Sequence, residues 1–187
     1  AAAKQREQAG AGGDEGNLAE GVHVAAASFA IVATEALAYH AEWMRTRSAD
    51  YQPDVRDRLK MGALVSGVQY VRAQQVRQLV RREVDAALAR RDVLLAPATP
   101  IPAPVLGEKA TQLGDGTSDL RSALIRFTRP FNLSGHPACS VPCGFTAAGL
   151  PLGMQLVGRP FDEATVLRAG DAYQRLTDWH ARRPVLA

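Results

Sequence analysis

Aromatic residues are scarce in this 187-residue chain, at 6% of the sequence. Alanine, valine and leucine must therefore supply most of the packing in a hydrophobic core. Cysteine is scarcer still, because the chain contains only Cys139 and Cys143. Four residues apart on one extended strand, their side chains point to the same face but lie too far apart for an easy disulfide. We expect both to be reduced core thiols in a cytoplasmic protein.

The sequence also lacks a long apolar run and a dense block of charge. No stretch approaches about 18 apolar residues, which predicts no transmembrane helix and no membrane partner. No charged-then-apolar leader opens the chain, and its first residue is Ala1 without a Met, which suggests a fragment, a processed chain or a partial sequence. The net charge of +3 comes from scattered arginines, so no nucleic-acid partner is expected.

Familiar catalytic and metal-binding motifs are missing. Neither a Gly-x-Ser-x-Gly elbow nor a His-Glu-x-x-His helix occurs. His136, Cys139 and Cys143 have the residue types of a zinc site, but lack a second Cys/His pair at zinc spacing. A nucleophile pair of His136 with Cys139 is the alternative, yet no third group is there to orient it. We expect no metal site, no cofactor and no catalytic residue in this chain.

Helical periods occupy the first half of the chain. Residues 1–17 are rich in alanine, glycine and glutamine without a hydrophobic period, and are expected to be a flexible segment. Apolar residues at helical spacing predict helices at 24–45 and 68–91, with a short helix between them that starts at Pro53. On the first helix, His40 is interpreted as a packing histidine, with a catalytic role as the alternative.

Strand signals are concentrated in residues 92–158. Short apolar runs bounded by glycine and proline predict buried strands at 93–96, 138–141 and 154–157. Between the first two strands we expect a polar loop at 107–116 and a helix at 119–127, capped by Thr117 or Ser118 and ended by Pro130. A last helix opens at Asp162 and Glu163. This order predicts an α/β fold, a mixed β-sheet layered with α-helices, in which residues 18–187 form a single domain.

Three motifs in this region together resemble one family. They are residues 92–100 (DVLLAPATP), 127–145 (FTRPFNLSGHPACSVPCGF) and 149–158 (GLPLGMQLVG). The last two are fairly specific in combination, although neither is so alone. The chain resembles the C-terminal part of the amidase-signature hydrolases over about residues 22–179.

The catalytic machinery of that family is absent from this sequence. The family hydrolyses or transfers amides with a Ser nucleophile, a second Ser joined through a cis peptide, and a Lys, all in its N-terminal half. Here no Gly/Ser-rich loop occurs, and the only lysines, Lys4, Lys60 and Lys109, lie outside the family's lysine context. The resemblance therefore implies half of the sheet and one wall of the substrate pocket, in an isolated chain that is inactive.

Five positions match the substrate-binding side of the family. The resemblance implies that Thr99, Thr128 and Asn132 lie near the pocket, with loop capping or turn hydrogen bonds as the alternative. Arg58 matches an arginine that contacts a substrate carboxylate in the amidase-like subunits of tRNA-dependent amidotransferases, with an exposed charge as the alternative. Ile125 stands where those subunits carry an aspartate for the substrate's ammonium. An apolar side chain cannot offset the desolvation of an ammonium, which disfavours glutaminyl-tRNA chemistry and favours a neutral or aryl/alkyl amide.

Two functions follow from the sequence. In the first, the chain is the C-terminal portion of an amidase and binds a small-molecule amide together with the missing N-terminal half. In the second, it is a non-catalytic α/β module that binds a partner chain. Half a sheet leaves an unpaired edge and an uncovered helix face. We therefore also expect self-association through exposed apolar surface.

Overall fold

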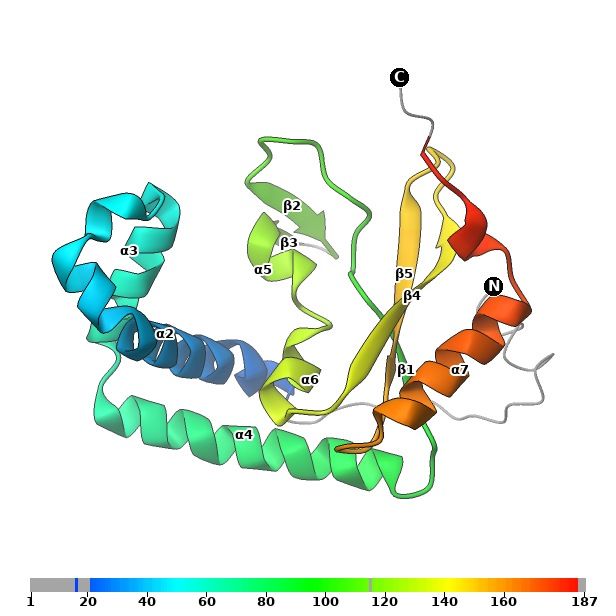
Figure 1. Ribbon diagram of the computed structural model, residues 1–187, viewed down its shortest axis with the longest axis horizontal. Helices are drawn as coiled ribbons and strands as arrows, with labels where there is room; N and C mark the ends of the chain where they lie inside the picture. Colours follow the sequence, from blue (N-terminus) through cyan, green and yellow to red (C-terminus); the bar gives the residue numbers. More distant parts are fainter. Residues whose placement is uncertain (1–15, 17–20, 115, 185–187) are drawn as a thin grey trace. The chain divides into compact units, whose positions relative to one another are not determined.

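The computed structural model describes residues 16, 21–114 and 116–184 (Figure 1). They belong to two compact units, a helical unit within Leu18–Glu83 and a second unit that includes Val84–Ala187. Of the segment 1–17 that is expected to be flexible, only Gly16 is among the described residues. The expectation of one domain over residues 18–187 stays a prediction.

The helical unit contains the helices that the apolar spacing predicts. They are α2 (Gly21–Thr46), α3 (Pro53–Met61) and the start of α4 (Gly67–Leu88), with short 3-10 turns η1 (Ser48–Asp50) and η2 (Gly62–Leu64). Pro53 occupies the first turn of α3, where its missing N–H costs no hydrogen bond. Gly62 allows the end of α3 to approach α2, because a Cβ at this position would collide with the carbonyl oxygen of Ala33.

His40 lies in a cluster of aromatic rings on this unit. Its Nδ1 lies 2.9 Å from the hydroxyl of Tyr51. Its ring also packs edge-on to Tyr39 and at a tilt to Trp43. These contacts are those of the packing histidine that the sequence predicts.

Helix α2 is apolar on two faces. On one face Val24, Ala27 and Ile31 are buried. The other exposes large side chains, namely Phe29 (49%), Val32 (61%), Tyr39 (77%) and Trp43 (46%). By length and composition alone, His23–Thr46 could cross a membrane, with a mean hydropathy of 1.4. A search for unbroken apolar stretches misses this helix, because polar residues interrupt its apolar ones. A helix that protein covers on both faces has the same composition as one that crosses a membrane.

The second unit is built on a three-stranded sheet, which confirms that the three predicted strands pair with one another. Its strands β1 (Leu94–Pro97), β4 (Ala138–Phe145) and β5 (Pro151–Val157) have the order β1-β5-β4, and both pairings are antiparallel. β4 and β5 form a hairpin whose turn places Gly149 at a φ of 79°, a conformation that glycine adopts without strain.

One face of this sheet is covered by α7 (Glu163–Arg175) (Figure 1). The core between them consists of Val141, Met154, Leu156 and Val166, with Cys139 and Cys143 partly buried against it. Both cysteines are free, as expected. Burial raises the pKa of the Cys143 thiol above its ordinary value of 9.0, so the thiol stays protonated at neutral pH.

Arg159 connects the end of β5 to the end of α4. Its Nη2 donates hydrogen bonds to the carbonyl oxygens of Leu88, at 3.0 Å, and Arg91, at 2.8 Å. Carbonyls at a helix C-terminus have no partner within the helix, and a cationic donor there also opposes the helix dipole. The guanidinium therefore completes the C-terminus of α4.

The segment expected to be a polar loop contains a hairpin instead. Its strands are β2 (Ala110–Leu113) and β3 (Gly116–Asp119). Thr117 and Ser118 pair across this hairpin with Gln112 and Thr111, so neither caps the following helix. Asp119 does so, and its carboxylate accepts a hydrogen bond from the backbone N–H of Ser122.

Pro130 begins a helix, although the sequence pattern favoured it as the end of one. The expected single helix at 119–127 is divided into α5 (Leu120–Leu124) and a later α6 (Arg129–Ser134), with Pro130 in the first turn of α6. A proline in a first turn sacrifices no helical hydrogen bond. The same residue is therefore compatible with either interpretation of the sequence.

The first prediction concerns Asp162, which caps α7 by accepting hydrogen bonds from the backbone N–H and the hydroxyl of Thr165. The Thr165 hydroxyl is the main reason that the pKa of Asp162 lies below its ordinary value of 3.8. Asp162→Ala should lower the urea midpoint of unfolding at about pH 7, because the cap is lost. A depressed pKa stabilises the fold above 3.8, and this stabilisation disappears as the pH falls through the lower pKa of the folded state. The two midpoints should therefore converge in acid.

Asp162→Asn is the matched control, since asparagine keeps an accepting oxygen but does not titrate. At about pH 7, the urea midpoint of Asp162→Asn should lie closer to the wild-type midpoint than the midpoint of Asp162→Ala does. A difference between wild type and Asp162→Ala that is unchanged at about pH 2.5 would contradict the electrostatic part of this account.

Candidate functional site

Three of the predicted site residues lie on one helical face. Ile125 ends α5, Thr128 precedes α6, and Asn132 lies one turn later. The backbone N–H of Arg129 donates to the carbonyl oxygen of Ile125 (3.0 Å), and that of Asn132 to the carbonyl oxygen of Thr128 (3.1 Å). Both bonds have the four-residue spacing of a helix, although residues 125–128 form a turn between α5 and α6, and residues three and four apart at this spacing are neighbours on one surface. Ile125 is 40% exposed, Asn132 is exposed and Thr128 is half-buried.

The two threonines form local hydrogen bonds. The Thr99 hydroxyl donates to the carbonyl oxygen of Ile101 at 2.8 Å, and the Thr128 hydroxyl donates to that of Ile125 at 3.3 Å. These are the turn hydrogen bonds that were the alternative for both residues. Because each hydroxyl donates its hydrogen bond to a backbone carbonyl, its oxygen remains available only as an acceptor. A substrate N–H is the kind of group that such oxygens can bind.

Arg58 lies on α3, in the helical unit. Its guanidinium is 3.0 Å from the carboxylate of Asp54, one turn earlier, and the two side chains are 46% and 60% exposed. An exposed pair of this kind contributes little to stability. Its role in binding a substrate carboxylate stays a prediction, as do the roles of Thr99, Ile125, Thr128 and Asn132.

Gln155 is a buried polar residue that the sequence motifs did not single out. It lies in β5 between Met154 and Leu156 and is 2% exposed. Its Nε2 donates to the carbonyl oxygen of Pro97 at 2.9 Å and to that of Phe127 at 2.8 Å. Met154 and Leu156 face α7, so by strand alternation Gln155 faces the opposite side of the sheet. A lone amide within an apolar strand is the signal that could have identified it.

His136 also has partners that sequence spacing does not reveal. Its side chain is fully buried, with Nε2 3.1 Å from the carboxylate of Asp85 and Nδ1 2.8 Å from the hydroxyl of Ser134. It does not form the pair with Cys139 considered above. Ser134 is only 1% exposed and donates to the carbonyl oxygen of Phe131. Although the residue types match a Ser-His-Asp triad, substrate cannot reach this serine, and the group instead joins the end of α6 to α4.

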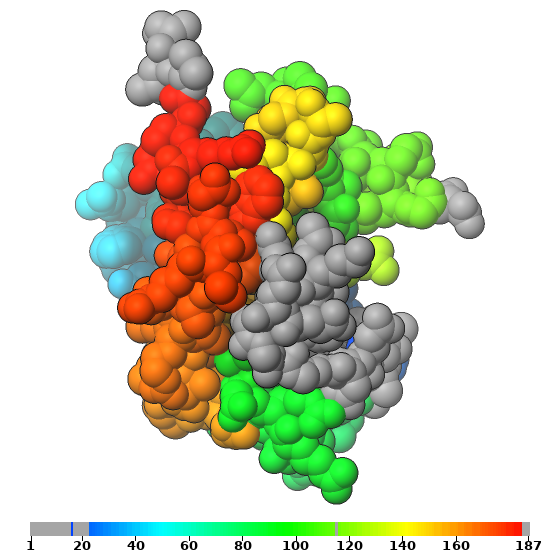
Figure 2. Space-filling view, turned by 90° about the vertical axis from the view of Figure 1, so that its right-hand side faces the viewer, coloured from blue at the N-terminus to red at the C-terminus, as the bar shows by residue number. Residues whose placement is uncertain are grey.

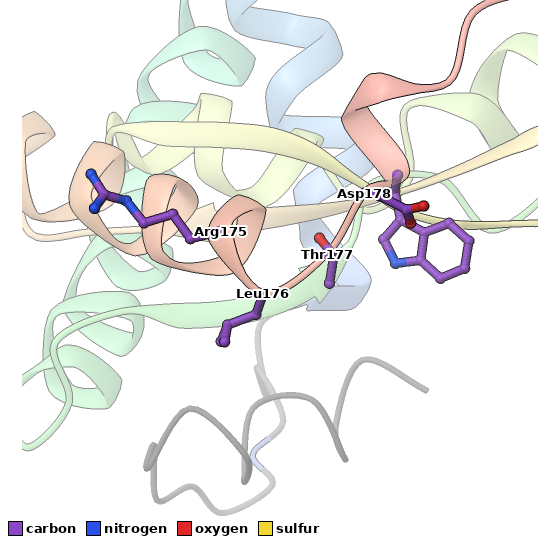
Figure 3. A pocket seen from close by; sticks show the side chains of 5 residues that line it. Arg175, Leu176, Thr177 and Asp178 are labelled. Carbon is purple, nitrogen blue, oxygen red and sulfur yellow. The ribbon is translucent and has the colours of Figure 1, made fainter.

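The second unit also has a hollow beside the segment that follows α7. The end of β4 contacts the C-terminal segment there, with the rings of Phe145 and Trp179 6.1 Å apart and the Arg182 guanidinium over Phe145. Figure 2 shows this segment, in red, lying against the yellow part of the chain. The neighbouring open hollow of about 430 Å³ is lined by residues 175–179. Figure 3 shows their side chains extending in different directions from one continuous segment. None of the predicted site residues lines it, so we do not assign the substrate to this hollow.

Metal chemistry finds no support in the described part of the chain. Within residues 16, 21–114 and 116–184, no group of three or more His, Cys, Asp or Glu side chains is arranged to hold a metal ion. His136 and the two cysteines, considered above for zinc, do not converge.

Comparison with known proteins decides the family. The family model described as Amidase matches residues 13–167, which is most of the chain. This chain belongs to the amidase family. The fold agrees with that membership, because the structure of a bacterial aryl acylamidase of the amidase-signature family superimposes with a TM-score of 0.78 and 25% identity. The superposition covers 98% of this chain and 41% of that one.

Curated relatives have more than one name. The A-type subunit of the glutamyl-tRNA(Gln) amidotransferase of Chloroflexus aggregans is 49% identical over 149 residues, covering 76% of this chain and 29% of that protein. An amidase of Pseudomonas putida is 45% identical over 159 residues, covering 84% of this chain and 34% of that protein. The chain thus spans about a third or less of the length of these relatives. The resemblance to the C-terminal part of an amidase is confirmed at the level of the family.

The second prediction concerns the carboxylate that contacts His136. Asp85→Ala should lower the free energy of unfolding by about 1–3 kcal/mol, because the buried Nε2 of His136 loses its partner. Asp171→Ala is the matched control, since Asp171 is an exposed helical aspartate whose partner, Arg175, is 78% exposed. That change should cost at most about 1 kcal/mol. Urea denaturation of both variants measures the difference, and equal costs would show that the His136 contact does not stabilise the fold.

Proposed function

We propose that this chain is the C-terminal portion of an amide-bond hydrolase that acts on a neutral or aryl/alkyl amide. In this role it contributes half of the sheet and one wall of the substrate pocket. The observation that carries the proposal is the common face of Ile125, Thr128 and Asn132 in a member of the amidase family. A wall of this composition combines one apolar side chain with two neutral polar ones.

The chemistry of that wall fits an uncharged amide. Ile125 offers partly exposed apolar surface to an alkyl or aryl group. The Thr128 oxygen can accept a hydrogen bond from an amide N–H, and the Asn132 carboxamide can both donate and accept. The nearest charged residues in the sequence, Arg126 and Arg129, are cationic and would repel an ammonium group. The wall therefore lacks the acidic partner that free glutamine or asparagine requires.

The hydrolytic step itself is proposed to come from the rest of an amidase. A serine hydroxyl is a weak nucleophile unless a base and an oxyanion hole are positioned around it. In the family that this chain resembles, a Ser-Ser-Lys set supplies these groups. The chain spans only 29% and 34% of the two relatives above. We therefore propose that it binds and orients the amide while the other portion cleaves it.

The names of the relatives favour a second candidate. Several relatives, including one at 49% identity, are named as a component of a glutamyl-tRNA(Gln) amidotransferase. That name supports a role in amide transfer from a donor amide. Ile125 argues against it, since the resemblance implies an acidic residue at this position in such proteins. Substrate preference separates the two candidates.

We further propose a partner for the exposed face of α2. Phe29, Val32, Tyr39 and Trp43 are spaced by 3, 7 and 4 residues, which puts them on one stripe of the helix. A large exposed apolar stripe usually marks an interface. The N-terminal portion of an amidase is the occupant that the short span of the chain supports, and self-association is expected when that portion is missing. The non-catalytic module that binds another chain would use the same face.

The third prediction tests the division of labour. The chain of residues 1–187 alone should hydrolyse no amide in a panel of neutral aryl and alkyl amides. Adding the separately produced N-terminal portion of the Pseudomonas putida amidase should produce turnover. Val32→Glu should weaken this complementation and reduce self-association measured by sedimentation. Leu167→Glu on α7 is the matched control, because both side chains are 61% exposed.

Three results would count against this proposal. Turnover by the lone chain, abolished by Ser134→Ala or Ser140→Ala, would reveal a nucleophile within it. An inert monomer that ignores the added portion would favour the non-catalytic module. Equal effects of the two glutamate variants would remove α2 as the interface.

The fourth prediction tests the substrate class in the complemented enzyme. The kcat/KM for a neutral aryl amide such as acetanilide should exceed that for glutamine by roughly tenfold or more, because glutamine's ammonium finds no acidic partner. Ile125→Asp should lower the ratio of the two kcat/KM values, because it adds an acidic partner for the ammonium. The uncharged Ile125→Asn should lower the ratio less. A wild-type preference for glutamine would support the amidotransferase candidate instead.

A further inference from the structure

Gln155 uses both of its amide N–H groups on two backbone segments that are distant in the sequence. One acceptor is the Pro97 carbonyl at 2.9 Å, and the other is the Phe127 carbonyl at 2.8 Å. The residue is 2% exposed, so water cannot readily replace either bond. A side-chain carboxamide has two N–H donors in one rigid plane. The two carbonyl oxygens are therefore held at a fixed separation by a single group.

Each of the two acceptors lies one or two residues before a predicted site residue. Pro97 is the last residue of β1, two residues before Thr99. The sheet ladder extends one step further, through the bond from the Ala98 N–H to the Gly153 carbonyl at 2.9 Å, and the chain then leaves the sheet. Phe127 lies in the turn between α5 and α6, directly before Thr128. Gln155 thus holds, by hydrogen bonds, the start of the segment that leads to Thr99 and the start of the segment that leads to Thr128.

The neighbours of Gln155 leave its side chain room to reach both carbonyls. In the strand register, Gln155 is flanked by Ala96 on β1 and Ser140 on β4. Both are small, and cross-strand neighbours of this kind define the space above a strand residue. A shorter or an apolar side chain at position 155 could not make both bonds.

We propose that Gln155 is a positioning residue that sets the Thr99 loop and the Thr128–Asn132 wall relative to each other. This inference rests on the proposed function, because the two segments matter together only if both line a pocket. Gln155 touches no substrate in this account. It acts through the backbone carbonyls of Pro97 and Phe127.

The fifth prediction separates positioning from general stability. Hydrogen exchange is measured on the wild-type chain of residues 1–187 and on Gln155→Met, which has a similar size but no donors. Exchange in residues 98–99 and 125–132 should accelerate by roughly tenfold or more in the variant, because the carbonyls of Pro97 and Phe127 lose the bonds that hold these segments to β5. Exchange in α7 should change much less. Gln155→Asn keeps the amide on a shorter side chain, so its exchange rates in these segments should lie between those of the wild type and those of Gln155→Met.

Val166→Ala is the matched control for lost stability. Val166 is 2% exposed in the core between α7 and the sheet, on the opposite face from Gln155. This variant should accelerate exchange in α7 rather than selectively in the two wall segments. If Gln155→Met accelerates exchange uniformly, or leaves both wall segments protected, the positioning role is overturned.

The complemented enzyme supplies the second readout. Gln155→Met should raise KM for a neutral amide by about tenfold while kcat changes less, and Val166→Ala should leave KM near the wild-type value. An unchanged KM in Gln155→Met would overturn the effect on the pocket. If wild-type portions give no turnover at all, the proposed function fails, and the exchange experiment still decides whether Gln155 holds the two segments together.

Discussion

The backbone pairing of β5 on both of its edges is the interaction on which the second unit depends. β1 pairs with one edge and β4 with the other, so β5 carries both register relationships of the sheet. Strand alternation then gives its two faces different tasks. Met154 and Leu156 build the core against α7, whereas Gln155 binds the backbone of the segments that lead to the candidate site. A shift of one residue in register would exchange these faces.

Local patterns predicted those parts of the fold that local physics determines. Apolar runs bounded by glycine and proline located β1, β4 and β5, and helical periods located α2, α4 and α7. The hairpin of β2 and β3 was missed because its strands are short and polar, so they carry no apolar alternation. Pro130 was misread because a proline is compatible with the end of one helix and the start of the next.

The candidate site was only partly predictable for a different reason. Ile125, Thr128 and Asn132 are close in the sequence, and their spacing places them on one helical face. The contact between His136 and Asp85 joins residues separated by 51 positions, and Gln155 reaches back 58 positions to Pro97. No local period encodes such pairs. Family membership, by contrast, depended on motif order, which the sequence displays directly.

The pairing of β1 has a consequence for how the chain acquires its structure. Its partner in the sheet, β5, lies some sixty positions later, with Leu94 opposite Val157, and Arg159 closes the end of α4 only after β5 is complete. During synthesis β1 must wait for the ribosome to release β5, and its unpaired edge stays available to other strands in that interval. Closing so long a loop also slows folding. The strand edge that β5 covers in the folded chain is therefore unprotected until the last part of the sheet has been synthesised.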